Sequence, residues 1–123
     1  MSEVVHSLLP LWTLIALVSL AVRTSALGDG TLTIHVANDT IDNLVVTLDD
    51  RTLSPHQTVL SGQVIYSNAS VVTSISADAS GQGHVYWTAM TTDRHMRHCG
   101  HHDEHCINDG DTIQVYADGP CSH

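Results

Sequence analysis

The residues best suited to chemistry are concentrated in the segment 95–106, which reads His-Met-Arg-His-Cys-Gly-His-His-Asp-Glu-His-Cys. This segment holds five of the chain's ten histidines and two of its three cysteines. Imidazole and thiolate are favoured ligands of zinc, copper and nickel, and carboxylates can complete such a site. The segment therefore predicts a site for a divalent transition-metal ion.

Histidine spacing within the segment selects the expected ligands. Two pairs of histidines are four residues apart, so one helical turn would bring either pair onto a single face. The expected ligands are His98, His101, His102 and His105, with His95, Asp103 and Glu104 as additional candidates. The spacing matches neither a Cys-x2-Cys zinc pattern nor His-Glu-x-x-His, so the sequence leaves zinc, copper and nickel open.

Three cysteines allow one disulfide and leave one thiol over. Cys99 and Cys106 bracket the histidines, whereas Cys121 follows the last expected strand, roughly 20 Å away for six residues at ~3.3 Å each. We therefore expect a Cys99–Cys106 disulfide, with Cys121 as the odd cysteine. Pairing of Cys121 with either of the others requires the long loop to fold back along the sheet. In the expected arrangement the histidines, rather than the cysteines, bind the metal.

The elements that position this segment are expected to be β-strands, because polar and apolar residues alternate along most of the chain. Alternating segments and shorter apolar pieces lie at 31–36, 44–48, 58–60, 63–66, 70–77, 84–92 and 112–117. Asn, Asp and Gly occupy the connections between them. Six or seven short strands with such turns predict an all-β fold, a small antiparallel β-sandwich. Trp87 is expected in its core and Tyr86 on its outer face.

The N-terminus resembles a secretory signal peptide in its layout. Residues 8–22 are nearly all apolar, and small residues stand at the −3 and −1 positions of a cut after Ala26. The run is short for a membrane span, which needs about 20 residues. Because no Lys or Arg precedes it, an uncleaved N-terminal anchor is the alternative. We expect residues 1–26 to be a cleaved signal and residues 27–123 to be one sandwich domain, with a His/Cys-rich loop at 93–110.

The charge balance restricts the partners of a secreted or periplasmic protein of this kind. Four Lys and Arg stand against 13 Asp and Glu, which gives a formal net charge of −9. Such a surface repels phosphate backbones, so nucleic acid is not an expected partner, whereas a metal cation or a basic protein surface is. Asn38 and Asn68 begin acceptor triplets for N-glycosylation, which matter only in a eukaryotic source.

The leading hypothesis is a secreted β-sandwich binding module that chelates a divalent transition metal through its His-rich loop. The alternative is a secreted protein-interaction domain, such as an effector, a toxin or an adhesin-like domain, that uses an acidic face and Tyr86. A pH-sensing role for the many histidines is a further hypothesis. The sequence does not indicate an enzyme, because it contains no Gly-x-Ser-x-Gly elbow and no phosphate-binding glycine motif. It does not indicate an oligomeric state either.

Overall fold

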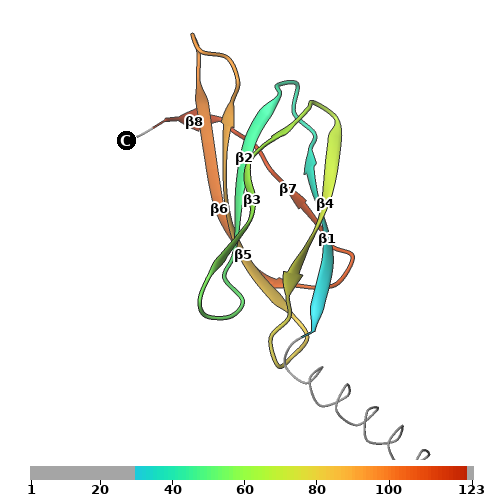
Figure 1. Cartoon of the computed structure of the whole chain (residues 1–123). Coiled ribbons are helices and arrows are strands. Elements are labelled where there is room, and N and C mark those ends of the chain that lie inside the picture. Colours follow the sequence, from blue (N-terminus) through green and yellow to red (C-terminus); the bar gives the residue numbers. More distant parts are fainter. Residues whose placement is uncertain (1–29, 122–123) are drawn as a thin grey trace, which may run out of the picture.

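The computed structural model describes residues 30–121, and its regular structure in this range consists of eight β-strands (Figure 1). The strands are β1 (Thr31–Asn38), β2 (Leu44–Asp50), β3 (Gln57–Ile65), β4 (Ala69–Ser76), β5 (Gly83–Thr91), β6 (His98–Ile107), β7 (Thr112–Gln114) and β8 (Gly119–Pro120). They form a three-stranded sheet in the order β4-β1-β7 and a five-stranded sheet in the order β3-β2-β5-β6-β8. All pairs are antiparallel except β1 and β7. The predicted all-β sandwich is confirmed.

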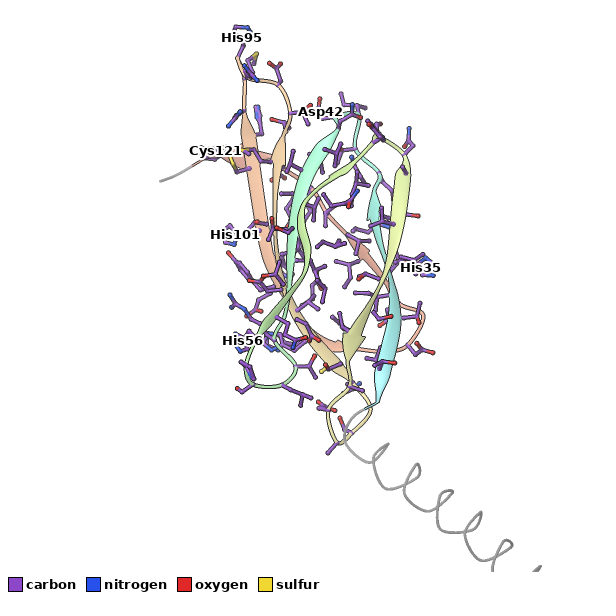
Figure 2. All side chains as sticks on the ribbon, viewed as in Figure 1. His35, Asp42, His56, His95, His101 and Cys121 are labelled. Carbon is purple, nitrogen blue, oxygen red and sulfur yellow. A yellow bond between two sulfur atoms is a disulfide. The ribbon has the colours of Figure 1, made fainter. Side chains whose placement is uncertain are left out.

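The hydrophobic core lies between the two sheets, where side chains fill the space in Figure 2. Every second residue of a strand points to the same face, so the apolar residues of an alternating strand all point into the core. Along β5, for example, Val85, Trp87 and Ala89 are buried, while the residues between them face outward. Burial of each large side chain contributes on the order of 1.5–3 kcal/mol. The predicted position of Trp87 in the core is therefore confirmed.

Asn38 is a buried polar residue whose side chain connects three segments of the chain. Its Nδ2 donates hydrogen bonds to the carbonyl oxygens of Asp42 (2.7 Å) and Ile65 (2.8 Å), and its Oδ1 accepts one from the backbone N–H of Thr40 (3.0 Å). A glycan would replace one of the two Nδ2 hydrogens that these bonds use, and it would not fit a fully buried side chain. The prediction that Asn38 is a glycosylation site is thus wrong for this fold, whereas Asn68 is exposed and stays a prediction.

The expected loop at 93–110 is largely a strand. Residues 98–107 form β6, which pairs with β5 from Cys99 opposite Met90 to Glu104 opposite Val85. Only the hairpin tip at 92–97 projects beyond the sheet (Figure 1). The sequence did not reveal this strand because its core-facing side carries little apolar surface. Gly100 instead packs against the backbone of Tyr116 and Ala117, so close that a side chain there would collide with the Tyr116 carbonyl.

The disulfide joins Cys99 to Cys121, and Cys106 is a free, exposed thiol. The expected Cys99–Cys106 pairing is wrong because both residues lie on one extended strand. Seven residues of strand separate them by about 23 Å at ~3.3 Å per residue. After β7, the chain instead returns to the five-stranded sheet as β8, with Gly119 opposite Cys99. This return brings Cys121 to Cys99, as the folded-back alternative requires.

The predicted signal peptide, residues 1–26, lies outside the described residues. Within 30–121, no helix is long and apolar enough to cross a membrane.

Candidate metal centre

Three potential metal ligands from two neighbouring strands meet on the outer face of the five-stranded sheet, the face turned away from the core. Their ligand atoms, one each from His84, Asp103 and His105, all lie within 4.8 Å of one another. His84 Nε2 is 2.7 Å from Asp103 Oδ1, and His105 Nε2 is 3.5 Å from Asp103 Oδ2. We call this group the His84–Asp103–His105 centre.

The register of the β5–β6 hairpin explains this grouping. Asp103 lies opposite Tyr86, whose side chain is also on the outer face, and His105 follows two residues later on the same face. His84 is two residues before Tyr86 and therefore lies beside His105 across the strand pair. The two imidazole rings are stacked, with centroids 4.1 Å apart and planes inclined by 20°.

A β-bulge follows His105 directly. Gly83 pairs with Ile107, but Val85 pairs with Glu104, so β6 has one residue more than β5 between these pairs. Cys106 is the extra residue of the bulge. Its φ is 57°, in the left-handed region that few non-glycine residues adopt. The bulge follows the outward-facing His105 and returns Ile107 to the core, where it is 3% exposed.

Electrostatics around the centre favour an ionised Asp103. A hydrogen bond with His84 is the main cause that lowers the pKa of the Asp103 carboxyl below its usual value, and the nearby charges of His84, His105 and Arg51 add to it. All three ligand side chains are accessible, with exposed fractions of 31% for His84, 48% for Asp103 and 62% for His105. A hydrated cation can therefore reach the centre from solvent.

The centre contains only part of the predicted ligand set. Of the four expected histidines only His105 belongs to it, together with the additional candidate Asp103. Because the segment is a strand and not a helical turn, residues four apart do not converge. His101 lies one position further along the outer face, opposite Thr88, with its ring centroid 6.1 Å from that of Tyr86 (Figure 2).

The remaining expected ligands point elsewhere. His102, opposite the buried Trp87, shares the inward side of β6 with Glu104, and its Nε2 is 4.0 Å from the Glu104 carboxylate. Glu104 also accepts a hydrogen bond from the Trp87 indole at 3.3 Å. His98 begins the strand, and His95 lies at the hairpin tip, far along the hairpin from the centre (Figure 2). None of these four residues belongs to the His84–Asp103–His105 centre.

His84 is the member of the centre that reasoning from the sequence missed. The sequence did contain an indication of this position, because His84 begins the long alternating strand that leads directly into the His-rich segment. A tight hairpin between the two would place His84 opposite His105. The assumption of a long loop instead put His84 at the end of the sandwich opposite the cluster.

Two imidazoles and a carboxylate can act together as one metal site. This donor set is used both by open zinc sites, which keep a position for water or substrate, and by non-haem iron sites. Ligand atoms on one tetrahedral zinc ion are about 3.4 Å apart, given bond lengths near 2.1 Å. The distances between the ligand atoms in the centre lie on both sides of this value. Small rotations of the exposed side chains would therefore bring all three atoms to one ion, and they would break the His84–Asp103 hydrogen bond. The Cys106 thiol is not part of the group.

A groove of about 360 Å³ lies beside the centre on the same sheet face. It begins at Tyr86 and His101 and extends towards the disulfide. Its lining residues are Val45, Thr47, Tyr86, Thr88, Ala89, Met90, Cys99, Gly100, His101 and Pro120. The His84–Asp103–His105 centre and the groove are therefore neighbours, with Tyr86 between them.

No protein-family model, curated protein or solved structure matches this chain. Its function is therefore inferred from its own residues and their arrangement.

Proposed function

We propose that this protein is a small binding module that holds one divalent transition-metal ion through His84, Asp103 and His105. The observation that carries the proposal is the convergence of three ligand atoms from two strands within 4.8 Å. The strands are long, paired over most of their length and anchored by a buried inner face on β5. Sites built on such elements hold their ligands more rigidly than sites built on loops.

The ligand types narrow the choice of metal. Calcium and magnesium prefer shells made of oxygen atoms, which two imidazoles do not supply. Imidazole suits zinc, copper and nickel, and one carboxylate is compatible with each. Zinc is the ion we propose to test first, because its coordination does not depend on a redox state.

We further propose that the protein acts outside the cytosol, either secreted or periplasmic. The Cys99–Cys121 disulfide supports this location, since structural disulfides persist in oxidising compartments and are rare in the cytosol. The acidic composition also suits capture of a cation, because a net charge of −9 attracts cations over a distance set by ionic strength.

Calorimetric titration of the purified protein with zinc tests the metal proposal. We expect one saturable site with micromolar or tighter affinity, and at least about tenfold weaker binding after His84→Gln or His105→Gln. His101→Gln is the matched control, since His101 lies on the same strand face outside the centre, and its affinity should equal that of the parent. Absence of saturable binding at tens of micromolar, or equal losses in all three variants, would overturn the proposal.

A protein-interaction role is the second candidate, and one observation favours it. Three connections at one end of the sandwich carry exposed apolar side chains: Ile41 is 92% exposed, Met96 69% and Tyr66 63%. Tyr86 is only partly accessible for such a role, because the guanidinium of Arg51 lies over its ring at 4.3 Å from the centroid. Chelator treatment discriminates the two functions. A metal module loses thermal stability when its metal is removed, whereas a domain whose histidines are incidental keeps the same Tm.

A further inference from the structure

Arg51 is a cation beside the proposed metal centre that forms no ion pair with a carboxylate among residues 30–121. Its backbone N–H donates a hydrogen bond to the carbonyl oxygen of His84 at 2.8 Å, which fixes the start of its side chain next to a metal ligand. Its guanidinium packs on Tyr86, the cross-strand neighbour of Asp103. The Nε of Arg51 is buried and has no hydrogen-bond acceptor within the described chain.

A metal ion in the centre would leave room for a further ligand. The group supplies three protein atoms, whereas zinc, cobalt and nickel bind four or more ligands. Open sites of this kind take water or an exogenous molecule in the remaining position. A divalent ion with one carboxylate ligand retains one positive charge, and Arg51 adds a second. Asp49, opposite Tyr86 on β2, offsets one of these charges, so the sum still favours an anion.

The neighbouring groove selects among anions. Its surface is partly apolar, from Val45, Met90 and Pro120, and it begins at Tyr86, where the centre ends. An inorganic anion would leave this surface in water. An organic acid would instead place its carboxylate between the metal and Arg51 and bury its hydrocarbon part in the groove.

We infer that the metal-loaded protein binds a small organic carboxylate in this way, with Arg51 as its second anchor. Guanidinium and carboxylate form strong, charge-assisted hydrogen bonds, often two in parallel. The inference rests on the proposed metal function. The groove limits the size of the acid that can bind. A volume of about 360 Å³ fits an acid of several carbon atoms and not a folded protein segment.

Visible absorption of the cobalt-loaded protein tests the inference, since the d–d bands of Co²⁺ respond to a change of ligand. Acetate, hexanoate and inorganic phosphate are the probes. We expect saturable spectral changes with both acids and roughly tenfold tighter binding of hexanoate, because its extra methylene groups enter the groove. Phosphate binding as tight as that of hexanoate would overturn the assignment to organic acids.

Three variants locate the ligand. Arg51→Gln should weaken both acids by about tenfold, whereas it removes no Co²⁺ ligand and should not weaken Co²⁺ binding. Arg94→Gln, at the exposed hairpin tip, is the matched control and should behave as the parent. Thr88→Trp fills the groove from an exposed position and should abolish the advantage of hexanoate over acetate.

The outcomes separate the two proposals. A cobalt spectrum that forms but does not change with either acid, in the parent itself, overturns the carboxylate inference and leaves the metal function standing. If no cobalt binds, both are overturned.

Discussion

Asp103 is the residue that connects the two histidines of the proposed metal centre, since each of its carboxylate oxygens faces one imidazole. Its pKa is lowered first by the hydrogen bond with His84 and then by neighbouring positive charge. Asp103 therefore stays ionised below the pH at which free aspartate does, and it offers an anionic ligand to a cation in mildly acidic as well as neutral solution.

Asp103→Asn tests this role at nearly constant size. The amide cannot carry a negative charge, so we predict at least about tenfold weaker zinc binding at pH 7, with an unchanged far-ultraviolet circular dichroism spectrum. Asp118→Asn removes an exposed carboxylate elsewhere and serves as the control. Equal zinc affinities of parent and Asp103→Asn would show that the carboxylate is not a ligand.

At the scale of the element, the β-bulge at Cys106 decides which side of the sheet Ile107 occupies after the outward-facing His105. A regular continuation of β6 would turn Ile107 outward and place the next residue in the core. The bulge avoids this by holding one residue in the left-handed region. Such a conformation costs roughly 1–2 kcal/mol for a residue with a side chain, and little for glycine.

The pair Cys106→Gly and Cys106→Val measures the importance of that conformation. We predict that the valine variant is less stable than the glycine variant by about 1–2 kcal/mol in urea unfolding, because a β-branched residue tolerates positive φ poorly. Zinc affinity should survive the glycine substitution, which also removes the free thiol. Equal stability of the two variants would argue against the bulge geometry.

Element prediction succeeded where one face of a strand is buried by the opposite sheet. The sequence pattern predicted strands that correspond to β1, β2 and β5, and it correctly placed Trp87 in the core. It failed for β6, whose inward residues include Gly100 and Glu104 and therefore display no apolar period. The predicted disulfide assumed a loop where β6 lies, so the missed strand explains why that pairing was wrong. It also explains why the expected histidines do not converge. His84 meets Asp103 and His105 because of the register in which β5 pairs with β6. The spacing of residues within one segment does not give this register.

At the scale of the whole molecule, Asp50 links the two sheets. It lies at the end of β2, and its Oδ2 accepts a hydrogen bond of 2.7 Å from the backbone N–H of Ser76, the last residue of β4. Its Oδ1 accepts another from the N–H of Thr52 at 3.0 Å. Burial acts to raise the pKa of Asp50, but the hydrogen bonds from Thr52 and Ser76 outweigh it and lower the pKa.

Asp50→Asn should therefore destabilise the fold in a pH-dependent way. A carboxylate whose pKa is lower in the folded than in the unfolded state stabilises the fold above the unfolded value, about 3.9, and this contribution is lost as the pH falls through the folded value. We predict a loss on the order of 1–3 kcal/mol at pH 7 that becomes smaller towards pH 2, measured by urea unfolding. A loss of the same size at both pH values would contradict the assignment.

The most direct test of the metal centre is the position of a bound ion in crystals grown with zinc, located by anomalous scattering at the zinc edge. We predict one strong anomalous peak at about 2.0–2.2 Å from a nitrogen of His84, a nitrogen of His105 and an oxygen of Asp103. A peak held instead by His98, His101 or His102, or the absence of a peak in crystals that contain zinc, would contradict the proposed centre.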